Sequence, residues 1–128
     1  MINIRGVVIR KAKVIAEDDR RKIISVLNGE IGVRDMHILF MKKGEQILGN
    51  HAHWYEEIMY VLKGSCHYWL RNSMTNEVEE IDMVEGDIML RAPYVVHTCV
   101  CSEDAILLDG SSQTWVSEDW NHIREILK

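Results

Sequence analysis

The chain has 128 residues, of which 47% are hydrophobic, and a formal net charge of -5 at pH 7. This length can form one hydrophobic core and is short for two domains, so we expect a single domain over residues 1–128. The acidic balance, with a pI near 5.6, argues against binding nucleic acid or anionic membranes through a basic surface.

Short apolar runs separated by Gly, Asn and acidic clusters predict an all-β chain. Many short strands at close spacing favour a closed barrel or a double sheet over a parallel α/β layer. In chain order, the predicted strands are Val7–Ile15, Lys22–Val26, Gly32–Met41, Gln46–Gly49, Glu56–Leu62, Cys66–Arg71, Glu77–Met83, Asp87–Arg91, His97–Cys101 and Ala105–Asp109.

Only the C-terminal tail predicts a helix. Ser117 is a suitable N-cap, Glu118 and Asp119 favour the first turn, and apolar residues recur at helical spacing from Trp120 to Leu127. We expect this short helix to pack outside the barrel.

The sequence gives no sign of export or of a membrane span. No stretch approaches the roughly 18 consecutive apolar residues that a span needs, and the first residues lack the pattern of a secretory leader. The three cysteines, Cys66, Cys99 and Cys101, lack CxxC spacing, which argues against a disulfide framework or a structural zinc site. We therefore expect a cytoplasmic protein with no membrane partner, whose cysteines are small buried side chains.

Four potential metal ligands stand at informative spacings. His51 and His53 flank one residue, Glu57 follows four positions later, and His97 lies far downstream. Residues i and i+2 of a strand point to the same side, so the two neighbouring histidines can face one cavity. Three imidazoles and one carboxylate suit a divalent transition metal, namely Mn, Fe, Ni, Co, Cu or Zn.

Two segments around these residues resemble the signature motifs of the cupin superfamily. The resemblance implies a double-stranded β-helix or jelly-roll barrel, with its core at about residues 33–110, N-terminal strands in 1–32 and a tail in 111–128. In place of the glycine usual in the turn of the second motif, the chain has Tyr94. The matching residues are Gly44, His51, His53, Glu57 and Gly64 in the first segment and Gly86, Asp87, Pro93 and His97 in the second.

The resemblance implies a metal-binding cupin that acts on a small polar or carbonyl-containing metabolite, as a dioxygenase, isomerase or decarboxylase. A first alternative is a metal-free nucleotide-sugar ketoisomerase or epimerase, because the run from Asn50 to His53 resembles the sugar-modifying branch of the family. In that branch a histidine, here His51 or His53, removes a proton next to a carbonyl. A second alternative is a cupin that binds or senses a small ligand without turnover.

The expected partners are a small molecule and a second copy of the chain. An exposed apolar strand is a hazard unless it is covered, so we expect Val7–Ile15 to pair with a neighbouring subunit in a homodimer.

The orientation of several polar residues is open at this level. Arg34 and Arg91 stand in apolar strands, where an inward arginine would need an anion, and burial statistics favour the outward orientation. Strand register decides whether His67 and Cys99 face the cavity. His37 is expected to face away from the apolar side of its strand.

Some larger side chains are expected near the candidate site. Met59 follows Glu57 by two residues and should share its side of the strand, whereas other methionines fill the core. Tyr60, Trp69 and Tyr94 are expected to border the site.

Overall fold

The computed structural model describes residues 4–114 and 123–124, and of these 45–51, 123 and 124 are described by their backbone only. The described residues form strands and turns without a helix. The strands are β1 (Val7–Lys11), β2 (Lys13–Glu17), β3 (Lys22–Ser25), β4 (Asp35–Met41), β5 (Gly44–Ala52), β6 (Glu57–Lys63), β7 (Ser65–Asn72), β8 (Val78–Val84), β9 (Asp87–Arg91), β10 (Val95–Cys101), β11 (Ala105–Ser111) and β12 (Ile123–Arg124).

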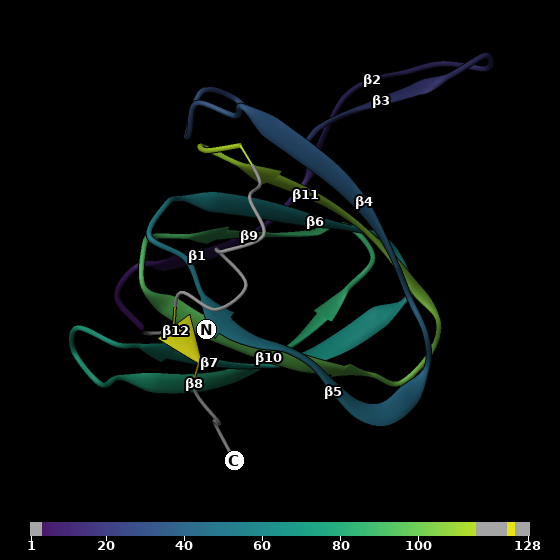
Figure 1. Cartoon of the computed structure of the whole chain (residues 1–128). Helices are drawn as coiled ribbons and strands as arrows, with labels where there is room; N and C mark the ends of the chain where they lie inside the picture. Colours follow the sequence, from purple (N-terminus) through teal and green to yellow (C-terminus); the bar gives the residue numbers. More distant parts are fainter. Residues whose placement is uncertain (1–3, 115–122, 125–128) are drawn as a thin grey trace.

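Two five-stranded antiparallel sheets face each other and enclose the core (Figure 1). Sheet 1 has the strand order β1-β9-β6-β11-β4, and sheet 2 has the order β12-β5-β10-β7-β8. Most neighbouring strands are distant in sequence, as when β10 pairs with both β5 and β7. This is the predicted jelly-roll barrel of the cupin type. The β2–β3 hairpin forms a separate two-stranded ribbon that extends away from the barrel (Figure 1).

The barrel interior is built from alternate residues of each strand. Along β7, every second side chain is buried, from Cys66 and Tyr68 to Leu70, while His67 and Trp69 between them lie on the outer face. This period of two is the signature of a sheet with one buried face, and it settles His67 as an outward residue. Its ring nitrogens lie 2.7 Å from Asp82 Oδ1 and 2.7 Å from Glu80 Oε1.

The first five residues of strand β6, Glu57 to Val61, are buried on both faces of the sheet. Met59 and Val61 point into the barrel, whereas Ile58 and Tyr60 form a second apolar cluster on the outer face with Ile88 of β9. Partly buried residues of the segment 26–33, among others, pack against this second cluster. Sheet 1 therefore has an apolar cover on its outer side, and the expectation that Tyr60 borders the site is wrong.

Two of the sequence predictions for the chain ends need correction. Val7–Ile15 is not one strand: β1 pairs along its length with β9, and the chain then leaves the barrel as β2, which pairs with β3. In the tail, Ile123 and Arg124 form strand β12 beside β5 instead of part of a helix. The rest of the predicted helix lies outside the described residues.

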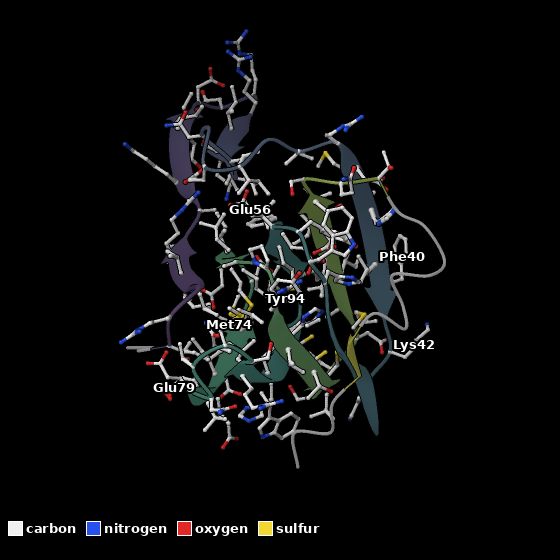
Figure 2. All side chains as sticks on the ribbon, turned by 60° about the vertical axis from the view of Figure 1, so that its left-hand side comes forward. Phe40, Lys42, Glu56, Met74, Glu79 and Tyr94 are labelled. Carbon is white, nitrogen blue, oxygen red and sulfur yellow. The ribbon has the colours of Figure 1, made fainter. Side chains whose placement is uncertain are left out.

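Strand β4, at one edge of sheet 1, turns the side with its larger apolar residues outward. Met36, Ile38 and Phe40 lie on its outer side with exposed fractions of 57%, 60% and 72%. Of these, Phe40 is labelled in Figure 2. His37 shares the inner side with Leu39, which packs against the barrel core. His37 thus faces away from the side that carries Met36, Ile38 and Phe40, as predicted, although that apolar side lies outside the barrel.

No helix among residues 4–114 and 123–124 is long and apolar enough to cross a membrane.

Two motif glycines, Gly64 and Gly86, have similar backbone conformations but different surroundings, so substituting each by alanine separates the backbone cost from the steric cost. Gly64 and Gly86 have φ values of +85° and +92°, in the region that other residues adopt at a cost of roughly 1–2 kcal/mol. A Cβ at Gly64 would lie 2.8 Å from Ala105 Cα and even closer to the carbonyl oxygen of Asp104, while one at Gly86 would meet nothing within 4 Å. We expect Gly86→Ala to lower the free energy of unfolding by that backbone cost alone. Gly64→Ala should cost a further 1–3 kcal/mol or so from the steric clash.

Urea denaturation of both variants measures this difference. Equal destabilisation by the two substitutions would show that the β6–β7 turn is not sterically closed over β11.

Candidate functional site

Three of the four predicted ligands meet inside the barrel. His53 follows β5, Glu57 begins β6 and His97 lies on the inner side of β10. All three are buried, with one ligand atom of each within 4.8 Å of the others. The centroids of the His53 and His97 rings are 6.1 Å apart. The motif spacing therefore predicted a real cluster of two imidazoles and one carboxylate.

The fourth predicted ligand, His51, is placed by its backbone only. In the β5–β10 ladder His51 is the register partner of His97, so the two residues stand side by side on neighbouring strands. Its side chain lies outside the described part of the structure. A role for His51 in the cluster stays a prediction.

The position of His53 depends on the turn between β9 and β10. The backbone N–H of Tyr94 donates a hydrogen bond to the carbonyl oxygen of His53, at 2.7 Å. Tyr94 has a φ of +67°, the conformation that explains why a glycine is usual at this point of the motif. On its other side, the His53 ring stacks on Tyr55 at 4.8 Å with an interplanar angle of 16°. Tyr94 thus acts on the site through its main chain.

A buried arginine lies next to Glu57. Arg91, only 4% exposed, places its Nη2 atom 3.2 Å from Glu57 Oε1 and 3.7 Å from Asp109 Oδ1. Its Nη1 atom contacts the sulfur of Met89 at 3.3 Å. The register explains the contact, because Glu57 on β6 pairs directly with Arg91 on β9, and Asp109 lies on β11 at the other side of β6. We call Glu57, Arg91 and Asp109 the buried ion triad.

The outward orientation expected for Arg91 is therefore wrong. An isolated arginine is rarely buried, but two carboxylates on the neighbouring strands supply the anions that it needs. Arg34, in contrast, is exposed as expected. Sequence reasoning missed Asp109 altogether. The sequence did contain a sign of its role. Asp109 directly follows the apolar run from Ala105 to Leu108, at a position where alternation along the strand points the side chain into the barrel.

The triad contains two carboxyl groups, Glu57 and Asp109, but only one cation, Arg91. This imbalance affects the pKa values of its members. Burial, followed by the negative charge of Glu57, raises the pKa of Asp109 to about 7, although Arg91 acts in the opposite direction. For Arg91, burial alone would lower the pKa, but the charges of Glu57 and Asp109 outweigh it and raise the pKa. The guanidinium therefore stays charged, while Asp109 can take up a proton near neutral pH.

The other residues expected near the site lie on different faces of their strands, some inside the barrel and some outside. Met59 points inward as predicted, and its sulfur accepts a hydrogen bond from the Tyr68 hydroxyl at 3.0 Å. Cys99 also points inward and is buried. Trp69 lies on the outer face of β7, against His67 at a centroid distance of 4.7 Å, so its expected place beside the site is wrong.

No protein-family model and no curated protein matches the chain. Several solved structures share its fold. The WlaRB TDP-quinovose 3,4-ketoisomerase from Campylobacter jejuni superposes with a TM-score of 0.82 at 20% identity, covering 95% of each chain. A double mutant of the QdtA 3,4-ketoisomerase from Thermoanaerobacterium thermosaccharolyticum, in complex with TDP, gives 0.75 at 21% identity over 91% of this chain and 87% of that one.

A third similar structure is that of the ChmJ 3'-monoepimerase from Streptomyces bikiniensis in complex with dTDP-quinovose. Its TM-score is 0.77 at 14% identity, over 92% of this chain and 69% of that one. At these identities the comparisons show a shared fold. The fold alone does not define the reaction, because one architecture carries many different sites.

The protonation of Asp109 predicts how stability varies with pH. A carboxyl whose pKa rises from 3.8 in the unfolded chain to about 7 in the fold binds its proton more tightly when folded. Its contribution to stability is fully present below pH 3.8 and is lost as the pH rises through 7. At 1.36 kcal/mol per pKa unit, the loss is at most about 4 kcal/mol.

We expect Asp109→Asn to flatten the decline in unfolding free energy between pH 5 and pH 8, as measured by urea denaturation at each pH. Asp19→Asn, at an exposed residue of the β2–β3 turn, is the control that should leave this decline in place. An unchanged pH profile for Asp109→Asn would mean that Asp109 is ionised throughout this range.

Proposed function

We propose that the chain is a nucleotide-sugar ketoisomerase or epimerase in which His53 is the general base. The observation that carries this proposal is the buried ion triad directly beside the two imidazoles. A base that accepts a proton becomes a cation, and the Glu57 carboxylate lies close enough to both rings to stabilise that cation. The shared fold with the ketoisomerases and the epimerase supports the same reaction class.

The proposed reaction is balanced within the sugar. His53 removes the proton from the carbon next to a ketone, and the electrons of the broken C–H bond form a carbon–carbon double bond as the carbonyl oxygen gains a proton. In the resulting enediol, a proton can be added to the former carbonyl carbon while the hydroxyl on the neighbouring carbon loses its proton. The ketone then stands on that neighbouring carbon, one position away. Returning the proton instead to the original carbon from the opposite face inverts that carbon. We assign the proton donor for the carbonyl oxygen to His97.

Within this proposal Arg91 and Asp109 are positioning residues. Arg91 holds the Glu57 carboxylate through a contact of 3.2 Å. Asp109 contacts the same guanidinium from the adjacent strand β11, which fixes Arg91 from a second side. Together they keep a negative charge at one place beside the histidines, where it is needed when the imidazolium forms.

A metal centre is the second candidate function, favoured by the approach of His53, Glu57 and His97 within 4.8 Å of one another. These donor types suit a divalent transition metal, with His51 as a possible fourth ligand. Arg91 argues against this assignment, because its guanidinium already compensates the charge of Glu57 and would repel a cation bound to the same carboxylate. We therefore rank metal-dependent chemistry second.

Deuterium uptake tests the proposed base directly. The substrate to test is TDP-4-keto-6-deoxyglucose, which is bound in a structure of a mutant QdtA 3,4-ketoisomerase. In D2O we expect the enzyme to incorporate solvent deuterium at a carbon next to the ketone of this sugar, as detected by NMR. His53→Asn should lower this rate by at least about 100-fold, because it removes the general base. His67→Asn, on the outer face of β7, is the matched control and should retain the rate. Full activity of His53→Asn would contradict the assignment, and binding of the sugar without deuterium uptake would favour a non-catalytic cupin.

Chelation separates the two candidate functions. We expect the rate of deuterium uptake to survive exhaustive dialysis against a chelator, because the proposed steps use side chains alone. Loss of activity on chelation, with recovery when a divalent metal is added back, would instead support the metal centre at His53, Glu57 and His97.

We also propose a homodimer, in which a second copy covers the apolar stripe of Met36, Ile38 and Phe40 on β4. The segment expected to pair between subunits is partly engaged already, since β1 pairs with β9 of the same chain. Light scattering should give the mass of a dimer for the wild type and of a monomer for the double variant Ile38→Glu, Phe40→Glu. Met74→Glu alters an equally exposed residue elsewhere on the molecule (Figure 2) and should stay dimeric. A monomeric wild type at micromolar concentration would contradict this proposal.

A further inference from the structure

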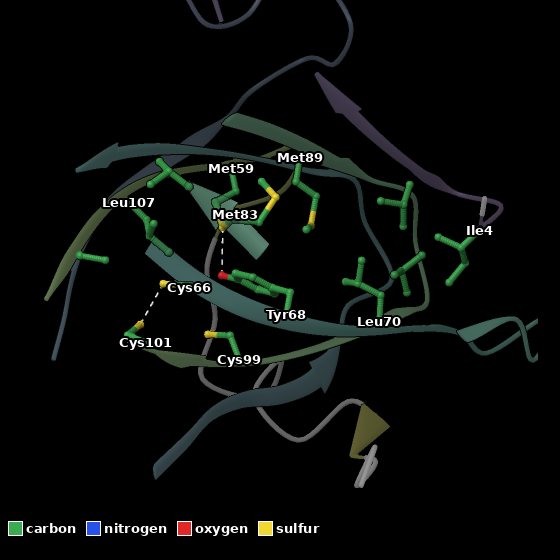
Figure 3. Close-up of a cluster of buried hydrophobic side chains, with 14 residues drawn as sticks. Ile4, Met59, Cys66, Tyr68, Leu70, Met83, Met89, Cys99, Cys101 and Leu107 are labelled. Atoms are coloured by element: carbon green, nitrogen blue, oxygen red, sulfur yellow. Dashed lines mark hydrogen bonds between the residues drawn. The ribbon is translucent and has the colours of Figure 1, made fainter. Parts of the chain in front are cut away.

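All three cysteines of the chain meet at one place inside the barrel, on strands of sheet 2, whereas the buried ion triad stands on strands of sheet 1. Cys66 lies on β7, and Cys99 and Cys101 lie two residues apart on the inner side of β10. Their sulfur atoms are all within 4.8 Å of one another, and the Cys66 and Cys101 Sγ atoms are 2.8 Å apart (Figure 3). Each side chain is 2% exposed. The sequence did not predict this cluster, because its members come from two strands that become neighbours only in the folded barrel.

The surroundings of the cysteines are apolar and rich in sulfur. The barrel core that contains them also holds Met59, Met83 and Met89, whose side chains lie in the same close-up (Figure 3). Among the described residues, the group of close ligand atoms around these sulfurs consists of the three cysteines without an Asp, Glu or His. The donors that this part of the barrel offers are thus thiols and thioethers, which are soft ligands and favour soft metal ions over hard ones.

We propose that Cys66, Cys99 and Cys101 form a binding site for a single Cu(I) ion. Cu(I) is a soft ion that accepts thiolate ligands, and three sulfur atoms already stand close together. Zn²⁺ fits less well, because its structural sites are almost always tetrahedral and need a fourth ligand. The Tyr68 hydroxyl donates a hydrogen bond to the Met59 sulfur, and burial raises the pKa of Tyr68, so this group stays protonated and does not supply a phenolate as the fourth ligand.

Charge balance also favours a monovalent ion. One thiol loses its proton to solvent as one Cu(I) ion forms a copper–sulfur bond, so the apolar core gains no net charge. Neither copper nor sulfur changes oxidation state in this step. A net charge in this core would be costly, since a buried ion without a counter-ion loses its hydration.

The cysteine cluster lies close to one end of the β7–β10 ladder, which gives the ion a route inward. Cys101 is the last residue of β10, and its register partner Cys66 is the second residue of β7. The hydroxyls of Ser65 and Ser102, next to these cysteines, are paired at 2.8 Å at the exposed end of the barrel. Opening of this terminal rung would expose two of the three thiols without unfolding the barrel, as the ends of strands open at low free-energy cost.

Competition for Cu(I) under anaerobic, reducing conditions tests the site. The full chain is titrated against the Cu(I) complex of the chromophoric chelator bicinchoninate. We expect the wild type to withdraw one Cu(I) per chain from the chelator, and X-ray absorption of the product to show sulfur ligands only. Cys66→Ser and Cys101→Ser should each weaken the affinity by at least about tenfold, since even outer-shell changes at metal sites have effects of that size.

Two controls keep the outcome specific. His53→Asn, in the candidate active site, should bind Cu(I) as the wild type does, so failure of the copper site and failure of the proposed enzyme activity are distinguishable. Met89→Leu removes a core sulfur outside the cluster and should also bind normally. If a serine variant does not fold, as judged by circular dichroism, the matching alanine variant replaces it.

Three results would overturn the proposal. The first is a wild-type chain that takes no Cu(I) from the chelator. The second is a variant without cysteines that takes up the ion equally well. The third is preferential binding of Zn²⁺ over Cu(I), in direct competition, by the reduced His53→Asn variant, in which the separate cluster of His53, Glu57 and His97 lacks one ligand.

Discussion

The buried contact between Arg91 and the carboxylates of Glu57 and Asp109 is the constraint on which the interior of the barrel depends. Moving a guanidinium out of water is costly, and an arginine left without its partners in this position would destabilise the fold by roughly 3–5 kcal/mol. The three residues come from β9, β6 and β11, which are adjacent in sheet 1 in that order. Their charges can be compensated only when these strands are in register, so the ion triad favours the fully closed barrel over partly formed ones.

The same contact links the fold to the candidate chemistry. Glu57 is bound on one side by Arg91 and lies on the other side within reach of His53 and His97. A carboxylate that is already fixed and charged needs little rearrangement when a neighbouring imidazole becomes cationic, and such preorganisation is a main source of catalytic power. The arrangement also accounts for the ranking of the two candidate functions, because a fixed guanidinium and a divalent cation compete for the same oxygen atoms.

The sequence predicted the parts of this site that local spacing determines. The run from His51 to Glu57 and the distant His97 matched a motif, and the structure brings the described members together. Parity within a strand was less predictable. For Arg91 the general rarity of buried arginine favoured the wrong side, because the sequence does not show that Glu57 and Asp109 flank it across the sheet.

The same limit applied to the edge strand and to the cysteines. On β4, hydrophobicity alone would place Met36, Ile38 and Phe40 inside the barrel, yet these residues lie on its outer side. Cys66 is 35 residues from Cys101 in sequence, so no short motif contains both. In each case the missing information was which strands are neighbours and in what register, and hydrogen bonding between distant segments decides that.

The burial of the first five residues of β6 on both faces of the sheet has a consequence for how the molecule opens. This strand lies at the centre of sheet 1, between β9 and β11, with apolar side chains packed against it from the barrel interior and from the outer cluster. Its amide protons should exchange with solvent only when the whole domain unfolds, whereas those of the β2–β3 hairpin, whose residues are largely exposed, should exchange through local opening. The chain therefore combines a slowly exchanging centre with a labile arm, and limited proteolysis should cut first in that arm.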